Sequence, residues 1–361
     1  MTTPNTPKYK AKDFQADNPA NPEKKVAIRW CPGCGDYAIL SQVQRVMAEL
    51  GRPKEEFVVV SGIGCSSRFP YYMNTYGFHT IHGRAPSFAT AIRATREDMS
   101  VWVITGDGDS LSIGGNHLIH VLRRNVDIQL LLFNNRIYGL TKGQYSPTSE
   151  VGKRTKSTPM GSLDRPFNPI QVALGANSTF VARTVDVFVK HQRAMIEASY
   201  HHRGASFLEI YQNCNIFNDG AYAPIGGQRI PGVEYEKKKG EVQALQTIEL
   251  VHGAPMVFGK KDEPKGLRLN GSKWEIFDIG DRFSADDAVV YDETDLGLAQ
   301  LAATLDYPNF PVPVGVFFRI KAPTYDDAAR AQLAEAKAQV GNAGLKELLY
   351  AGETWTVEDD G

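Results

Sequence analysis

The chain has 361 residues, 42% of them hydrophobic, and its 40 basic and 41 acidic side chains give a net charge of −1. This length and composition supply one large or two moderate cores, while the balanced charge argues against a general nucleic-acid binder. No stretch reaches the roughly 18 apolar residues of a membrane span and the N-terminus has no apolar signal core, so we expect a cytoplasmic protein that binds no membrane.

The N-terminal part combines a polar arm with a cysteine-bearing turn. Residues 1–25 are rich in Pro, Asn, Thr and Lys and lack hydrophobic periodicity, so we expect an extended or disordered arm. Cys31 and Cys34, with Pro and Gly between them, form a turn that feeds a helix with an apolar face from Ile39 to Leu50. Both thiols of such a turn lie on one side, a geometry that binds Zn²⁺ or an iron–sulfur cluster.

A strand, a loop and a helix are predicted next. The strand Phe57–Ser61 is β-branched and ends in a glycine turn that carries Cys65. The aromatic stretch 71–78 is typical of a loop, and Ala85–Arg96 is a helix of small residues suited to close packing on a sheet. The third cysteine is therefore expected at a sheet edge, where open α/β folds bind ligands.

The clearest pattern in the chain is a strand, a glycine turn, a helix and a second strand in succession. Val101–Ile104 and Ile128–Phe133 are apolar strands, and Asn116–Arg124 is the helix between them. Because parallel strands joined in this way end at the same edge of the sheet, Asp107 and Asn135 are expected side by side. Carboxylate and amide oxygens suit Mg²⁺, which shares its ligands with a substrate diphosphate. Ordinary turn chemistry is the alternative explanation of these two polar turns.

The rest of the chain alternates predicted strands and helices and then becomes irregular. A long polar loop over 138–169 leaves directly from the proposed Mg²⁺ turn, so we expect it to serve the site. The elements predicted after it are a helix from Pro169 capped by Asn168, a strand over Ser178–Arg183, a helix over Val185–Tyr200, a strand over Ser206–Tyr211, a helix over Val242–Val251, a short strand at Trp274–Phe277 and an Ala-rich helix over Asp326–Tyr350.

The number and spacing of cysteines are informative. The cysteines of the chain are Cys31, Cys34, Cys65 and Cys214. Without a secretion signal, this set argues for a metal or cluster site rather than a disulfide framework. Four thiolates complete either a tetrahedral Zn²⁺ site or one [4Fe–4S] cluster, and spacing alone leaves both open. The long separation of Cys65 from Cys214 favours a cluster assembled by the fold.

Several motifs in one order resemble a single enzyme family. The spacing of Gly-Asp-Gly and Asn-Asn is similar to the diphosphate motif of thiamine-diphosphate enzymes. The chain also carries WCPGCG at 30–35, GIGCSSR at 62–68, HGRA at 82–85, GDGD at 106–109, NNRIYGLTKGQYSPT at 134–148 and a lone cysteine at 214. This combination resembles the β subunit of 2-oxoacid:ferredoxin oxidoreductases over about residues 30–214, with weaker agreement beyond.

The resemblance implies an α/β fold with a mainly parallel sheet and helices on both faces, which binds thiamine diphosphate. It implies Mg²⁺ held by Asp107, Asn135 and the backbone carbonyl of Ile137, and a [4Fe–4S] cluster held by the four cysteines. The residues that match the family's thiamine-diphosphate contacts are Ile63, Gly64, Cys65, Ser66, His82, Gly108, Asp109, Asn135, Gly139 and Leu140. It also favours functional roles for His82, a catalytic candidate, and for Arg84.

The reaction implied by the resemblance is the oxidative decarboxylation of a 2-oxoacid, with coenzyme A as co-substrate and ferredoxin as electron acceptor. Thiamine diphosphate acts as the electron sink when CO₂ leaves. We expect 2-oxoglutarate, which gives succinyl-CoA, because Lys142 on the site loop is a cation that can pair with a second carboxylate. Arg68 could serve in its place, and Lys142 could be a solvated loop lysine. Pyruvate or another 2-oxoacid is the alternative substrate.

The resemblance also implies partner proteins. Thiamine catalysis needs a glutamate against the aminopyrimidine ring, which we do not identify in this chain and which two-subunit family members take from an α subunit. The sequence lacks the cysteine runs of a built-in ferredoxin domain. We therefore expect an α2β2 assembly that passes electrons to soluble ferredoxin.

We expect three regions: the arm at 1–25, a thiamine-diphosphate and iron–sulfur domain at 26–216, and a C-terminal extension at 217–361 that packs on the core or on the partner.

Two other functions remain open. A thiamine lyase or carboligase without redox chemistry would leave the four cysteines with no common task. A zinc-stapled scaffold subunit would use Asp107 and Asn135 only to shape turns, and it would be colourless where a [4Fe–4S] protein is brown.

Overall fold

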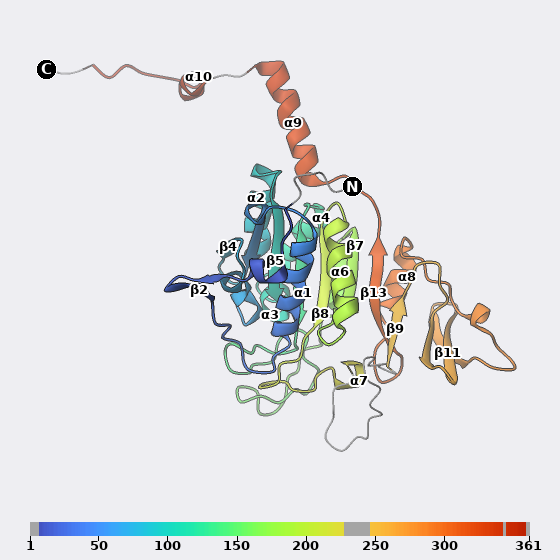
Figure 1. Cartoon of the computed structure of the whole chain (residues 1–361). Helices are drawn as coiled ribbons and strands as arrows, with labels where there is room; N and C mark the ends of the chain where they lie inside the picture. The colour runs from blue at the N-terminus through green and yellow to red at the C-terminus, as the bar shows by residue number, and fades with distance from the viewer. Residues whose placement is uncertain (1–6, 227–245, 342–343, 359–361) are drawn as a thin grey trace.

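An eight-stranded sheet forms the centre of the molecule, in the order β4-β3-β5-β6-β8-β7-β13-β9 (Figure 1). A computed structural model describes residues 7–226, 246–341 and 344–358 of the chain. The sheet is parallel except where β13 meets β7. Its strands are β3 (Phe57–Ser61), β4 (Tyr76–His79), β5 (Ser100–Gly106), β6 (Gln129–Asn134), β7 (Phe180–Val185), β8 (Ser206–Tyr211), β9 (Thr247–Leu250) and β13 (Val312–Arg319).

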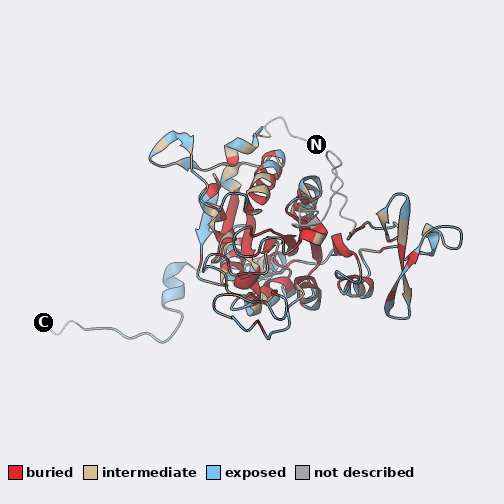
Figure 2. Ribbon diagram, turned by 90° about the horizontal axis from the view of Figure 1, so that it is seen from below, coloured by how far each residue is buried: buried red, intermediate tan, exposed pale blue. Residues whose placement is uncertain are grey.

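Helices cover both faces of this sheet. Val101 and Val103 of β5 pack into one core and Trp102 and Ile104 into the other, because successive side chains of a strand point to opposite faces. The first face is covered by α2 (Ala85–Thr95), α4 (Gly115–Arg123), α5 (Pro169–Gly175) and α8 (Leu296–Ala302), and the second by α1 (Asp36–Glu49) and α6 (Val189–His201). Both faces of the central strands are buried, as their red colour in Figure 2 shows, which explains their continuous apolar runs, whereas the edge strand β4 is exposed.

Short elements and a small second sheet complete the described chain. The short elements are η1 (Ala11–Phe14), β1 (Asp17–Asn18), β2 (Asn21–Lys25), η2 (Lys54–Glu56), η3 (Ser66–Tyr72), α3 (Asp107–Leu111), α7 (Ala223–Gly226) and η4 (Ala285–Asp287). The small antiparallel sheet consists of β10 (Val257–Lys260), β11 (Glu263–Asn270) and β12 (Lys273–Asp278). None of the helices in the described ranges has the length and apolarity to cross a membrane.

The N-terminal half follows the predicted order of elements, with three differences. The arm at 1–25 is not simply solvated: Phe14 is fully buried, its ring 5.6 Å from that of Phe57, and β1 and β2 form a hairpin. The stretch 71–78 contains the edge strand β4 rather than loop alone. The Gly-Asp-Gly turn begins the short helix α3. Each difference depends on a tertiary contact or on a segment too short to show periodicity.

The C-terminal third completes the main sheet instead of forming a separate layer. β13 pairs with β7 and β9 pairs with β13, so the predicted boundary after residue 216 divides one sheet. The helix predicted over 242–251 is wrong where it is described, because β9 occupies Thr247–Leu250; residues 242–245 lie outside the described part of the chain. A strand of four residues carries too few apolar positions to distinguish it from a helix.

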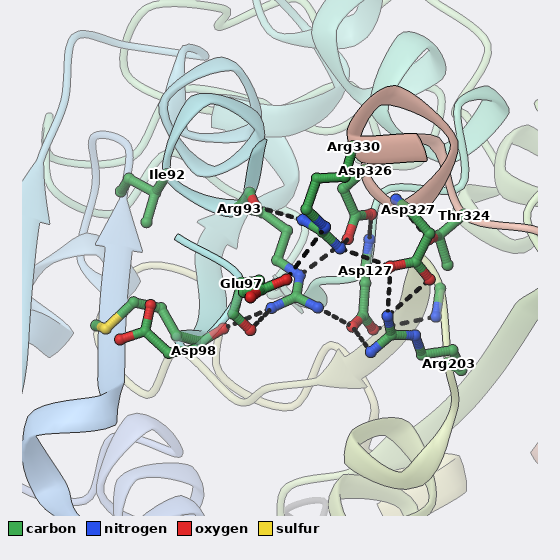
Figure 3. Close-up of polar contacts among 12 residues, drawn as sticks. Ile92, Arg93, Glu97, Asp98, Asp127, Arg203, Thr324, Asp326, Asp327 and Arg330 are labelled. Carbon is green, nitrogen blue, oxygen red and sulfur yellow. Dashed lines mark hydrogen bonds and ion pairs between the residues drawn. The ribbon is translucent and has the colours of Figure 1, made fainter. Parts of the chain in front are cut away.

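A network of buried ion pairs fixes the base of α9 (Tyr325–Val340) to the body (Figure 3). Arg93 of α2 donates to Asp326 at 3.1 Å and to Asp127 at 2.8 Å, and its side chain is only 5% exposed. Arg330, one turn further along α9, also donates to Asp326 at 3.0 Å. These contacts join α9, α2 and the segment just before β6, which are far apart in sequence.

Beyond its base, α9 projects from the body, as Figure 1 shows. Residues 331–339 are exposed, and α10 (Leu345–Leu349) follows (Figure 2). The continuous helix predicted over 326–350 is therefore interrupted. The reason is Gly341, whose φ of 81° lies in the left-handed region that ends helices.

Candidate functional site

Asp107 lies at the carboxyl end of β5, where the strand turns into α3, and it is buried. Two hydroxyl groups of the long loop reach it. Ser146 Oγ donates to Asp107 Oδ2 at 2.5 Å, and Thr148 Oγ1 donates to the same oxygen at 2.6 Å. Burial raises the pKa of Asp107, and the hydroxyl donors oppose this rise. A buried carboxylate held in this way is suited to a cation.

The end of β6 lies beside the end of β5. Asn135 Oδ1 accepts from the N–H of Ile137 at 3.2 Å, so this side chain closes its own turn. The preceding Asn134 donates through Nδ2 to Glu209 at 2.8 Å, and its Oδ1 lies 3.0 Å from the Thr148 hydroxyl oxygen. Thr148 therefore bridges the two strand ends, whose predicted proximity is confirmed.

The carboxylate of Asp109 forms hydrogen bonds with residues of three neighbouring segments. Its Oδ1 accepts from the N–H of Ile63 at 3.0 Å and from the N–H of Gly83 at 2.7 Å. The same oxygen lies 2.6 Å from Nδ1 of His82, and Oδ2 accepts from the Thr105 hydroxyl at 2.7 Å. Both carboxylate oxygens of Asp109 therefore already have hydrogen-bond partners within the protein. We expect any contact of Asp109 with the cofactor to come from its backbone.

Gly64 and Gly108 lie in turns predicted to contact the cofactor, and the space beside each glycine differs. Gly64 has a φ of 122°, and a Cβ placed there would meet no atom of the described residues within 4 Å, so this turn opens onto free space. A Cβ on Gly108 would lie 2.1 Å from the ring of Tyr138, whose hydroxyl donates to the Gly108 carbonyl at 3.0 Å. The turn at Gly64 thus leaves room for a bound group, whereas Gly108 makes room for a side chain.

All four cysteines line one cavity of about 200 Å³ beside these turns. Cys31 is exposed, Cys34 and Cys65 are half-buried, and Cys214 is buried. Burial raises the pKa of the Cys65 thiol to about 12 and also raises that of Cys34. Other residues in the wall of the cavity include Arg29, Trp30, Arg68, Asn135, Gly139, Leu140 and Lys142.

These surroundings fit the groups that the sequence resemblance implies. Four sulfurs around one cavity suit a [4Fe–4S] cluster, and the wall holds the cations Arg29, Arg68 and Lys142 as well as the buried Asp36. Within the described ranges, no three His, Cys, Asp or Glu side chains meet closely enough to hold a single metal ion. The carboxylate of Asp107, the amide of Asn135 and the open turn at Gly64 suit Mg²⁺ and a diphosphate.

Comparison with known proteins agrees with this geometry. Residues 62–210 match the thiamine pyrophosphate enzyme, C-terminal TPP binding domain. The chain is 45% identical over 190 residues to 2-oxoacid:ferredoxin oxidoreductase 1, subunit beta, of Aeropyrum pernix, covering 53% of this chain and 60% of that protein. It is 50% identical over 354 residues to 2-oxoglutarate oxidoreductase subunit KorB of Mycobacterium tuberculosis, covering 97% of this chain and 89% of that protein. The chain belongs to the family of 2-oxoacid:ferredoxin oxidoreductase β subunits.

A solved structure is similar along nearly the whole β subunit. It is a 2-oxoglutarate:ferredoxin oxidoreductase from Magnetococcus marinus with 2-oxoglutarate, coenzyme A and succinyl-CoA bound, and it matches with a TM-score of 0.70 and 30% identity. The match covers 97% of this chain and 98% of that chain. The predicted family, fold class and assignment to the 2-oxoacid oxidoreductases are therefore confirmed.

The remaining predicted residues of the β subunit lie around the same cavity and turns. Arg68 and Lys142 both line the cysteine cavity, and Lys142 has a φ of 75°, which is uncommon for a residue with a Cβ. His82 directs Nδ1 to Asp109, and its side chain is 35% exposed. Arg84 donates to the carbonyl of Ile113 at 3.2 Å. Their roles toward substrate and cofactor stay predictions.

Sequence reasoning missed four polar residues that support the site. Ser146, Thr148 and Asn134 belong to the motif over 134–148, but the motif alone does not show which of its hydroxyl and amide groups face Asp107. Gln212 follows β8 as Asn135 follows β6. Its place directly after a buried strand is the signal that could have identified it.

Proposed function

We propose that this chain is the β subunit of a 2-oxoglutarate:ferredoxin oxidoreductase. The reaction converts 2-oxoglutarate and coenzyme A into succinyl-CoA and CO₂, with two electrons passed to two oxidised ferredoxins and one proton released. The observation that carries the proposal is the cavity that the four cysteines share with Asn135, Gly139 and Leu140, because it would bring the proposed cluster next to the proposed diphosphate site.

The diphosphate half of the site is built on two strand ends. We propose that Asp107, Asn135 and the carbonyl of Ile137 hold Mg²⁺, and that thiamine diphosphate supplies the electron sink for decarboxylation when it is bound. The turns proposed to contact it carry Ile63, Gly64, Cys65, Ser66, His82, Gly108, Asp109, Gly139 and Leu140. The free space at Gly64 supports this placement. His82, held through Nδ1 by Asp109, would present Nε2 to the bound molecules.

The redox half is proposed to be one [4Fe–4S] cluster on the four cysteines. Cations at Arg29, Arg68 and Lys142 in the cavity wall would offset the negative charge of thiolates and cluster. The exposure of Cys31 supports electron exit to ferredoxin at the protein surface. A zinc-stapled scaffold is less well supported, because the described cysteines surround a cavity instead of meeting at one point.

The proposed assembly rests on the residues described around the cysteine cavity. Among the described residues that line the cysteine cavity there is no glutamate. We propose that an α subunit supplies the glutamate that thiamine catalysis requires, in an α2β2 enzyme of the cytoplasm.

Metal and cofactor analysis of the anaerobically purified chain with its co-purifying partner tests this function. We expect about four irons and four sulfides per β chain, bound thiamine diphosphate with Mg²⁺, and ferredoxin reduction that requires both 2-oxoglutarate and coenzyme A. Zinc without iron or thiamine diphosphate would contradict the proposal and support the scaffold alternative.

A further inference from the structure

Gln212 contacts both halves of the site. It is the first residue after β8, and its side chain is 1% exposed. Its Nε2 donates to Cys34 Sγ at 3.2 Å and to the carbonyl of Asn213 at 2.6 Å. Its Oε1 accepts from Nδ2 of Asn135 at 2.8 Å. One buried amide therefore joins a proposed cluster ligand to a proposed Mg²⁺ ligand.

The directions of these hydrogen bonds follow from one backbone group. A carbonyl can only accept, so the Gln212 atom 2.6 Å from the Asn213 oxygen must be Nε2. The other end of the amide is then Oε1, and the Asn135 atom that it meets must be the donor Nδ2. Asn135 consequently presents Oδ1 to its other side, where it accepts from the N–H of Ile137. The carbonyl of Asn213, acting through Gln212, and the N–H of Ile137 thus agree on which atom of Asn135 is available to a cation.

We propose that Gln212 is a positioning residue shared by the two cofactor sites, which orients the Asn135 oxygen toward Mg²⁺ and tunes the cluster through the Cys34 sulfur. This inference rests on the proposed function. Its first part follows from the amide geometry above, because a flipped Asn135 would turn an NH₂ group toward the cation.

The second part concerns the redox potential of the cluster. Reduction adds negative charge to a cluster and its thiolates, and an N–H donated to a ligand sulfur stabilises that charge. Gln212 is buried and Cys34 is half-buried, so the donor end of this hydrogen bond is shielded from water. Loss of this donor should move the midpoint potential to a more negative value.

Two substitutions separate the contacts of Gln212. Gln212→Met has a similar volume and removes both the donor and the acceptor. Gln212→Glu keeps an acceptor for Asn135 but loses the donor to Cys34. An ionised Glu has no proton to donate, and a protonated Glu would donate its single proton to the Asn213 carbonyl. Gln44→Met is the matched control, because Gln44 is also a buried amide, and it donates to the carbonyl of Tyr72 rather than to a cysteine or to Asn135.

The measurements use the assembled, anaerobically purified enzyme. Thiamine-diphosphate binding is titrated against Mg²⁺ after removal of the metal by a chelator, and the cluster potential is obtained from a redox titration followed by electron paramagnetic resonance. For Gln212→Met we expect Mg²⁺ affinity weakened about 10- to 100-fold and a more negative potential. For Gln212→Glu we expect an affinity no weaker than wild type and a more negative potential, and for Gln44→Met we expect neither change.

Wild-type values of both quantities in Gln212→Met would overturn the proposal, and so would a change in only one of them. Should Gln212→Met lose its iron, the potential of Gln212→Glu decides the sulfur contact, and a wild-type value there overturns the proposal. A wild-type enzyme that holds no iron or thiamine diphosphate refutes the proposed function instead, before any variant is compared.

Discussion

At the scale of single residues, the Thr148 hydroxyl stabilises the buried carboxylate of Asp107 by a hydrogen bond. Thr148→Val keeps the shape of the side chain but removes the hydroxyl that bridges Asp107 and Asn134. We expect Mg²⁺ affinity to weaken about 10- to 100-fold, measured by titrating thiamine-diphosphate binding with Mg²⁺. Thr148→Ser should restore most of it. Thr184→Val, a buried threonine whose hydroxyl contacts His191, is the control, and equal affinities in both Val variants would contradict this role.

The charge of Lys142 is expected to select the substrate. Its place in the cavity wall lets it pair with the second carboxylate of 2-oxoglutarate, which pyruvate lacks. Lys142→Ala should lower kcat/KM for 2-oxoglutarate about 10- to 100-fold and leave that for pyruvate unchanged. Lys156→Ala, an exposed lysine of the same loop, is the control. An unchanged preference in Lys142→Ala together with a lost preference in Arg68→Ala would assign the role to Arg68.

His202 links stability to pH. Its Nε2 lies 2.7 Å from the Thr179 hydroxyl, and burial, with Arg319 as a second cause, lowers its pKa to about 4. The unfolded chain takes up this proton near pH 6.5, so the contribution is complete above that pH and is lost as pH falls toward 4. Between about pH 6.5 and pH 5 the free energy of unfolding should fall by about 2 kcal/mol from this group.

Urea denaturation at these two pH values measures that loss. His202→Gln removes the titrating ring, so the variant should show a smaller decrease in the free energy of unfolding than wild type. His201→Gln, at the exposed neighbouring position, should keep the wild-type decrease. The same decrease in His202→Gln and wild type would show that other groups cause it.

At the scale of elements, the attachment of α9 depends on Arg93 of α2. Arg93→Met removes one of two arginines at each carboxylate, because Asp127 keeps its pair with Arg203 and Asp326 keeps its pair with Arg330. Losing these charged hydrogen bonds should cost about 1.5 to 3 kcal/mol, measured by urea denaturation. Arg96→Met removes a surface pair with Asp98 at the end of the same helix and should cost less than about 1 kcal/mol. Similar costs for both variants would show that the network contributes no more than a surface pair.

At the scale of the whole molecule, the C-terminal third is part of the sheet that holds the site. β13 covers β7 and contributes Phe317 and Phe318 to the core. A fragment of residues 26–216 would expose the edge of β7, whose residues are all buried in the whole chain, so it should aggregate or lack cooperative unfolding. A chain of residues 1–341 keeps the complete sheet and should unfold cooperatively. Cooperative unfolding of the 26–216 fragment, followed by circular dichroism, would contradict this dependence.

The sequence by itself predicted the parallel α/β core, the family and the strand ends that carry Asp107 and Asn135. These features depend on local signals: β-branched runs, glycine turns and short motifs in one order. The same signals identified the four cysteines as one group and Arg68 and Lys142 as neighbours of the site, which the shared cavity agrees with. They could not show that β9 and β13 enter the main sheet, because strand order is decided by pairing and not by periodicity.

Only the tertiary structure decided which side chains hold the site in place. Gln212 and Cys34 are 178 residues apart, and Arg93 and Asp326 are 233 residues apart. Such pairs leave no periodic trace, since each residue alone is an ordinary polar residue next to a strand or on a helix. The direction of a buried hydrogen bond depends on the complete set of donors and acceptors that folding brings together. The sequence thus determined the chemistry available, and long-range packing determined which atoms face the proposed cofactor sites.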